Sequence, residues 1–205
     1  MALVKCILNN HEVEYDDKEF EFITSYDSDY LHYIGDGINV TNPKGNISCY
    51  CMFKDYKGTS LDLSNFDTSN VTNMSFMFDA CINLEHLSLS NFNTNKVSDI
   101  SNMFCNCIKL KTLDISNFDT ENATNMEGMF YDCINLKTLD ISSFYINDTK
   151  ILNNMFWKCR SLETLKVGSD YLQFFLTHRI LLEIGNRVNI ISMSKLDKVV
   201  NDLFY

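Results

Sequence analysis

Cysteine is the residue type in this chain with the most obvious capacity for chemistry. Eight cysteines occur among the 205 residues, and Cys81, Cys107, Cys133 and Cys159 follow one another at intervals of 26 residues. Neighbouring strands of a sheet lie about 5 Å apart, so a cysteine column could form disulfides or hold metal ions. A free cysteine is also a small buried hydrophobic residue, and each of these occupies the same position of a repeated unit. We therefore predict structural thiols.

The remaining cysteines and the histidines give no pattern typical of a catalytic or metal site. Cys49 with Cys51, and Cys105 with Cys107, form C-x-C pairs without a second matched pair or a nearby histidine, which argues against zinc. The sequence contains no H-E-x-x-H, G-x-S-x-G or P-loop pattern. Four histidines lie in unrelated segments, at His11, His32, His86 and His178. We expect no catalytic residues, no metal and no cofactor.

Acidic residues are the other candidate group. The chain has 27 acids and 17 bases, a net charge of -10, which argues against direct nucleic-acid binding because phosphates would be repelled. The acids are densest over residues 11–36, where the candidate binding residues are Glu12, Glu14, Asp16, Asp17, Glu19 and Glu21. This segment is either a capping sheet with a charged outer face or an acidic patch that imitates phosphate charge.

The element that must position these residues is a repeat of 26 residues. Its units read LDLSNFDTSNVTNMSFMFDACINLEH from Leu61, LSLSNFNTNKVSDISNMFCNCIKLKT from Leu87, LDISNFDTENATNMEGMFYDCINLKT from Leu113 and LDISSFYINDTKILNNMFWKCRSLET from Leu139. Columns of Leu, Phe and Met keep one register through all four units. One coil alone cannot bury such a face, but stacked coils bury it for each other.

Within each unit the pattern predicts one short strand and one helical turn. Leu61 and Leu63 flank Asp62 with strand alternation, so two side chains point inward and one outward. The looser spacing around NMSFMF favours a helical or 3₁₀ turn on the opposite side. Candidate binding residues at outward strand positions are Asp62, His86, Asp114 and Asp140. Adjacent carboxylates there are either screened by water or compensated by a cationic partner.

Three regions follow from the repeat. Residues 1–46 predict an acidic N-terminal cap with antiparallel strands, residues 47–168 a solenoid, and residues 169–205 a mostly helical C-terminal cap. Within the solenoid, 47–60 read as a degenerate first coil, because Met52 and Phe53 precede Met77 and Phe78 by 25 residues. In the C-terminal region the sequence predicts a helix from residue 170, a strand over RVNIIS and a last helix beginning near Ser194.

The phrase LDLSNFDTSNVTNMSFMFDACINL resembles the BspA-like leucine-rich repeats of bacterial surface proteins. The resemblance covers about residues 47–168 and rests on the elements SNF-x-T, NM and MF-x-x-C-x-x-L in four consecutive units. It implies an α/β solenoid, a right-handed leucine-rich-repeat coil of short parallel strands and short helical turns. It also implies an adhesion or protein-interaction role without a catalytic site.

We therefore expect a non-enzymatic protein-binding module. The first reading is an intracellular binder or inhibitor of a protein with a basic, nucleic-acid-binding surface, of the kind that phages and mobile elements encode. The alternative is a cell-surface adhesion protein. No segment approaches the roughly 20 apolar residues of a membrane helix, and no secretory signal precedes the acidic region, so a cytoplasmic location without membrane contact is expected.

Overall fold

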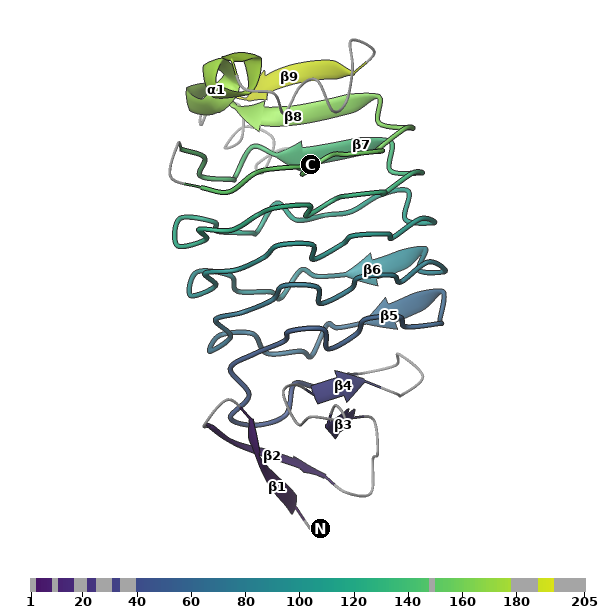
Figure 1. The fold of residues 1–205 in the computed structure, drawn as a ribbon, viewed down its shortest axis with the longest axis vertical. Coiled ribbons are helices and arrows are strands. Elements are labelled where there is room, and N and C mark those ends of the chain that lie inside the picture. Colours follow the sequence, from purple (N-terminus) through teal and green to yellow (C-terminus); the bar gives the residue numbers. More distant parts are fainter. Residues whose placement is uncertain are drawn as a thin grey trace.

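The computed structural model describes residues 3–8, 11–16, 22–24, 31–33, 40–147, 150–177 and 188–193, with backbone only for 175–177 and for the first strands up to residue 32. These residues form a parallel β-solenoid of about five turns, elongated along the stacking direction, with the N-terminal strands at one end and the C-terminal helix at the other (Figure 1). Successive coils repeat every 26 residues.

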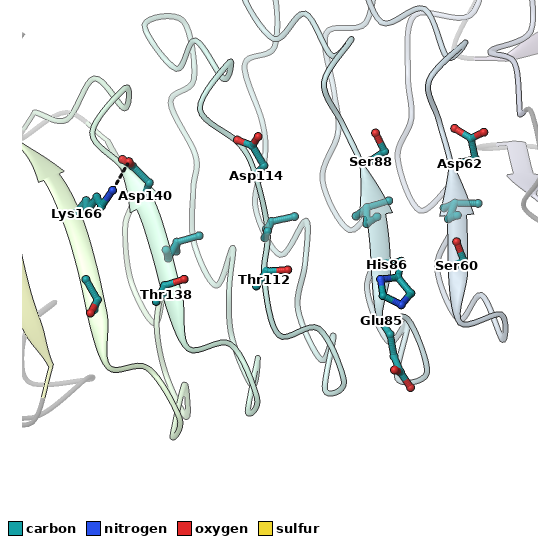
Figure 2. A pocket seen from close by; sticks show the side chains of 15 residues that line it. Ser60, Asp62, Glu85, His86, Ser88, Thr112, Asp114, Thr138, Asp140 and Lys166 are labelled. Atoms are coloured by element: carbon teal, nitrogen blue, oxygen red, sulfur yellow. Dashed lines mark ion pairs between the residues drawn. The ribbon is translucent and has the colours of Figure 1, made fainter. Parts of the chain in front are cut away.

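One side of the solenoid carries short parallel strands, except at residues 112–114, where no strand forms. The strands are β5 (Ser60–Asp62), β6 (His86–Ser88), β7 (Thr138–Ile141), β8 (Thr164–Gly168) and β9 (Asn189–Met193). β5 pairs with β6, and β7, β8 and β9 form a second sheet, all in parallel. The segment 112–114 lies in line between β6 and β7 (Figure 2). The strand predicted within RVNIIS is present as β9.

The opposite side of the coils forms a second ladder. Parallel bridges join Ser48 to Asn73, Asn73 to Asp99, Asp99 to Asn125 and Asn125 to Ile151. The first step spans 25 residues and the others span 26, as the sequence predicts. Because the N–H of Cys49 also donates to the carbonyl of Asn73 at 2.8 Å, the segment from residue 47 is a true first coil.

The predicted helical turn is wrong. Along residues 74–81, the N–H groups of Phe76 and Phe78 donate to Ser101 and Met103 of the next coil, both at 2.9 Å, whereas Met77 between them donates back to Met74 at 3.3 Å. Phe76 and Ala80 have φ of 58°. A helix needs negative φ at every residue, and its N–H groups bond within the helix. The coil instead alternates tight turns with coil-to-coil bonds, so the fold has little helix.

Stacked aromatic rings form the centre of the core. Fully buried phenylalanines repeat in one column, and consecutive rings lie 5.4 to 5.8 Å apart with interplanar angles of at most 11°. The column consists of Phe53, Phe78, Phe104, Phe130 and Phe156. Such offset stacking adds to the burial of apolar surface, and it requires neighbouring coils to keep one register.

Asn, Asp, Ser and Thr make many of the turns in this chain, which has only seven glycines and one proline. The carboxylate of Asp67 and the amide of Asn73 each accept the N–H two residues later, at 2.8 Å in both cases. Buried threonines bridge the coils, since Thr68, Thr94 and Thr120 each bond a residue of the next coil through the side-chain hydroxyl.

Both ends carry additional elements. β1 (Leu3–Leu8) pairs with β2 (His11–Asp16), and β3 (Phe22–Thr24) with β4 (Leu31–Tyr33), both in antiparallel fashion. Tyr33 is buried against Phe53, with ring centroids 5.0 Å apart. At the other end, the 3₁₀ helix η1 (Ser169–Tyr171) leads into α1 (Leu172–Thr177). The predicted helix beyond residue 177 and the last helix from Ser194 lie outside the described residues.

Candidate binding face

The outward side chains of the sheet form two rows that run across the coils (Figure 2). Strand pairing fixes both rows, because it places Asp62 opposite Ser88 and Asp140 opposite Lys166. One row reads Asp62, Ser88, Asp114, Asp140 and Lys166, and the other reads Ser60, His86, Thr112, Thr138 and Thr164. The structure therefore brings the predicted residues Asp62, His86, Asp114 and Asp140 to one face.

This face is hollowed into an open groove of about 690 Å³, lined by both rows. Leu87 also lines it and is only partly buried, whereas Leu61 and Leu139 in the same column are 1% and 2% exposed. Glu85 adds a further carboxylate beside His86. The sequence pattern does not identify Glu85 or the partial exposure of Leu87, because both depend on how the second coil closes.

The three aspartates of the first row are tied to their own coils. Each accepts the backbone N–H of the serine two residues later: Asp62 at 3.0 Å, Asp114 at 3.1 Å and Asp140 at 2.9 Å. These bonds from Ser64 hold the pKa of Asp62 below its usual value. Each carboxylate thus closes a turn with its Oδ1, and the Oδ2 of Asp140 also contacts Lys166.

Lys166 changes the charge balance of the row. Its Nζ lies 3.7 Å from the Oδ2 of Asp140, and both side chains are about 40% exposed, so the pair contributes little to stability. The repulsion predicted between Asp114 and Asp140 is therefore partly offset at Asp140. Asp62 and Asp114 have Ser88 between them, which separates these two carboxylates by two coil spacings.

The N-terminal acidic residues are only partly placed. Glu12, Glu14 and Asp16 hold alternate positions of β2, where they pair in register with Ile7, Lys5 and Leu3 of β1. Their side chains lie outside the described residues. The same is true of Asp17, Glu19 and Glu21 altogether.

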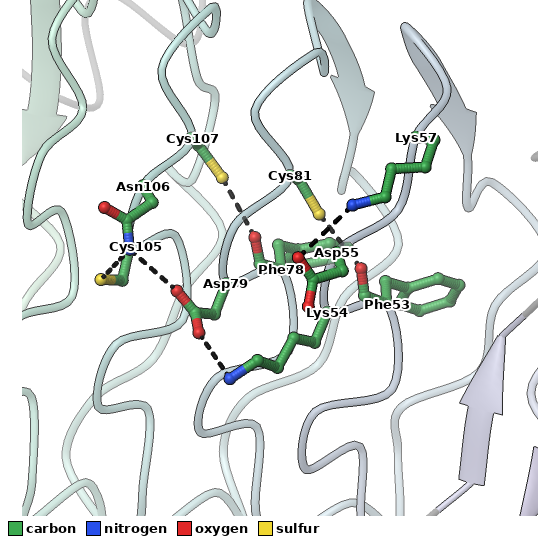
Figure 3. Close-up of polar contacts among 10 residues, drawn as sticks. All are labelled: Phe53, Lys54, Asp55, Lys57, Phe78, Asp79, Cys81, Cys105, Asn106 and Cys107. Carbon is green, nitrogen blue, oxygen red and sulfur yellow. Dashed lines mark hydrogen bonds and ion pairs between the residues drawn. The ribbon is translucent and has the colours of Figure 1, made fainter.

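The repeated cysteines are hydrogen-bond donors in the core (Figure 3). The thiols of Cys81 and Cys107 donate to the carbonyls of Phe53 and Phe78, at 3.1 and 3.3 Å, and the later two cysteines repeat this contact. All seven cysteines that the structure describes are buried and free of disulfides. Burial raises the pKa of Cys133 well above its usual value. These thiols are structural, and their protonated form suits the carbonyl partner.

A partly exposed ion pair lies near this column, on the side of the coil away from the sheet (Figure 3). Lys54 Nζ is 2.9 Å from Asp79 Oδ2, and Asn106 donates to Oδ1 of the same carboxylate at 3.2 Å. The bond to Asp79 raises the pKa of Lys54. Lys54 and Asp79 are 25 residues apart, which equals the first step of the repeat. The sequence alone therefore could have predicted that they lie on adjacent coils. The Asp79 carboxylate thus has a partner at each oxygen, Lys54 at one and Asn106 at the other, so we interpret this cluster as structural.

Two features are absent from the part of the chain that the structure describes. No three His, Cys, Asp or Glu side chains gather there in a way that could hold a metal ion. Similarly, no helix among those residues is long and apolar enough to cross a bilayer.

A comparison with known protein families finds a match to the solenoid. The model of the family described as "Mycoplasma protein of unknown function, DUF285" matches residues 47–167. No curated protein and no solved structure matches the chain. The matched region is the solenoid from its first coil to the end of β8.

Proposed function

The chain belongs to the DUF285 family, and we propose that it is a non-enzymatic binding module whose sheet face takes a protein partner with a basic surface. The observation that carries this proposal is the row of carboxylates at Asp62, Asp114 and Asp140 along a groove of about 690 Å³. Lys166 is the one cation among the described residues that line this groove.

The chemistry of the face favours a protein over a nucleic acid. Carboxylates repel phosphate but steer a basic surface toward them, and the hydroxyls of the second row can donate and accept hydrogen bonds. Leu87 supplies apolar surface at the floor of the groove. On this reading the protein is an intracellular binder or inhibitor whose natural target is a nucleic-acid-binding protein, of the type that phages and mobile elements encode.

A second candidate function is cell-surface adhesion, and the repeat consensus favours it. The elements SNF-x-T, NM and MF-x-x-C-x-x-L resemble BspA-like leucine-rich repeats, so we also propose the finer assignment to that right-handed repeat class. An adhesion protein would use the same face but meet an extracellular ligand. The two functions therefore differ in the partner and not in the scaffold.

The test compares two matched double variants in affinity capture at low and high salt. Asp62→Asn with Asp114→Asn removes two groove charges but keeps the oxygen that closes each turn. Asp55→Asn with Asp67→Asn removes two charges from exposed turns outside the groove. The bait is the full chain, and the lysate comes from the organism that encodes it.

The proposal is supported if a basic partner is captured at low salt but not at high salt, and if it binds the groove variant about tenfold more weakly. That loss corresponds to roughly 0.7 kcal/mol of binding free energy for each lost charge pair. The control variant must bind as the unmodified chain does. Equal loss in both variants, or salt-independent capture, contradicts it. Binding to extracellular matrix or cells, with no basic intracellular partner, moves the assignment to adhesion.

A further inference from the structure

A second pocket, of about 440 Å³, lies where β7 and β8 end, next to the sheet groove. Three carboxylates and two phenol rings line it, and they come from the unit that starts at Leu113, the unit that starts at Leu139, and η1. They are Asp119, Glu121, Asp170, Tyr145 and Tyr171. No Lys or Arg is among the described residues of its wall.

The repeat is interrupted at this pocket. Asp67, Asn93 and Asp119 occupy one position of the first three full units, and Tyr145 takes that position in the fourth. Its ring is 41% exposed, so it is not required by the core. The other coils close without an aromatic residue here. A local departure from an otherwise consistent pattern is where a functional residue is expected.

The ring of Tyr145 already accepts a cation on this scaffold. Lys150 Nζ lies 5.2 Å from the ring centroid, held by the carbonyls of Thr120 and Glu121 at 2.8 and 3.1 Å. Lys150 does not line the pocket. Tyr171 stands edge-on to Tyr145, with centroids 5.8 Å apart, and so forms a second wall.

The three carboxylates of the wall outnumber the charge of Lys150, so the surroundings of these rings are negative. Asp119 uses Oδ1 to accept the N–H of Glu121 at 2.9 Å, which orients its carboxylate at the turn. Burial, then Tyr145, Asp170 and Glu121 raise the pKa of the Tyr171 phenol. A pocket with aromatic walls and several carboxylates suits a cation that can stack on a ring and donate hydrogen bonds in one plane.

We propose that this pocket binds a guanidinium group, supplied by an arginine side chain of a protein partner. The planar guanidinium stacks on Tyr145 while its N–H groups donate to the carboxylates of Asp119 and Asp170. An ammonium carries the same charge but is not planar. It could not stack on the ring and donate a two-pronged bond to a carboxylate at the same time. This inference does not depend on the sheet groove, since it concerns different side chains.

The test is a titration of the isotope-labelled full chain with the capped tripeptide acetyl-Gly-Arg-Gly-amide, followed by NMR of the tyrosine rings. We expect saturable millimolar binding with shifts at Tyr145 and Tyr171. The citrulline tripeptide has the same shape without the charge and should bind at least about tenfold more weakly. Asp170→Asn and Tyr145→Leu should each weaken binding about fivefold or more.

Two control proteins separate this proposal from the sheet-face proposal. Asp67→Asn changes the counterpart of Tyr145 in the first full unit, and the groove double variant changes Asp62 and Asp114. Both should bind the tripeptide as the unmodified chain does. Equal binding of the citrulline peptide, unchanged binding by Asp170→Asn, or tighter binding of free arginine than of the tripeptide overturns the assignment.

Discussion

The hydroxyl of Thr94 donates a hydrogen bond to the carbonyl of Asp119 and accepts one from the N–H of the same residue, both at 2.8 Å. Thr94 is 2% exposed. Thr68 forms the same reciprocal pair of bonds with Asn93, at 3.0 and 2.8 Å. The buried hydroxyl uses both its donor and its acceptor. It joins two coils at a position outside both the strand pairs and the row of bridges on the opposite side.

Replacing Thr94 by Val keeps the shape but leaves two backbone groups without their partner. We expect Thr94→Val to lower the free energy of unfolding by about 2 kcal/mol. Thr94→Ser keeps both bonds, loses one methyl group and should cost about 1 kcal/mol. Urea unfolding, followed by the fluorescence of Trp157, the single tryptophan, measures both. A Val variant as stable as the Ser variant would contradict the bridging role.

Ser143 occupies the position of Asn91 and Asn117 in earlier units, and its Oγ is buried without a hydrogen-bond partner. The amide of Asn117 donates to the carbonyls of Leu89 and Phe92 of the preceding coil, at 3.0 and 2.8 Å. Ser143→Asn should restore this bridge and stabilise the chain by about 1 kcal/mol. Ser143→Ala, which only removes the unpaired hydroxyl, should be neutral or slightly stabilising. Destabilisation by both variants would show that the fourth coil differs in backbone from the third.

Cys133 makes stability fall at alkaline pH. Its pKa is raised in the folded chain, so its contribution is complete below the pKa of the unfolded thiol, about 8.5, and is lost as pH rises toward the folded pKa. Cys133→Ala should reduce the slope of unfolding free energy against pH by up to about 1.4 kcal/mol per unit between pH 9.5 and 11. Denaturant titrations across that range test this. An unchanged slope would mean that the thiol ionises equally in both states.

Ala80 lies in the left-handed region, at a φ of 58°. Glycine has no penalty there, so Ala80→Gly should stabilise the chain by about 0.5 kcal/mol, after the entropy gained by the unfolded glycine is subtracted. Ala123 is buried at an ordinary φ, and Ala123→Gly should instead cost about 1 kcal/mol. Thermal unfolding of the two variants should give shifts of opposite sign. Destabilisation in both would argue against strain at residue 80.

The spacing of the units was enough to predict the stacking of the coils. Leu61 pairs with Leu87 and Leu139 with Leu165, and the 25-residue first step through Ser48 and Asn73 is also confirmed. The outward positions of Asp62 and Asp140 followed from strand alternation alone. These features depend on a period, which a repeated sequence displays directly.

The helical turn was not excluded by the pattern, because only some of the residues with positive φ are types that favour it, such as Asn102, Gly128 and Asn154. Phe76 and Lys158 adopt φ of 58° and 63°, yet neither is a residue type that usually does so. Phe76 also donates its N–H to Ser101 of the next coil, and such a bond depends on the neighbouring unit. The pocket at Tyr145 was missed for a different reason. Its signal is the broken consensus of the fourth unit, whereas the predicted sites rest on positions that the units share.

Ile146 stands where the earlier units have Thr68, Thr94 and Thr120, and it is buried at 3% exposure. Its side chain has no hydroxyl to offer a further coil. A duplicated unit inserted before Leu113 would meet threonine at both junctions and lengthen the molecule by about 4.8 Å. The same unit added after the fourth coil would meet an apolar junction. Added units should therefore be tolerated better inside the array than after its fourth unit.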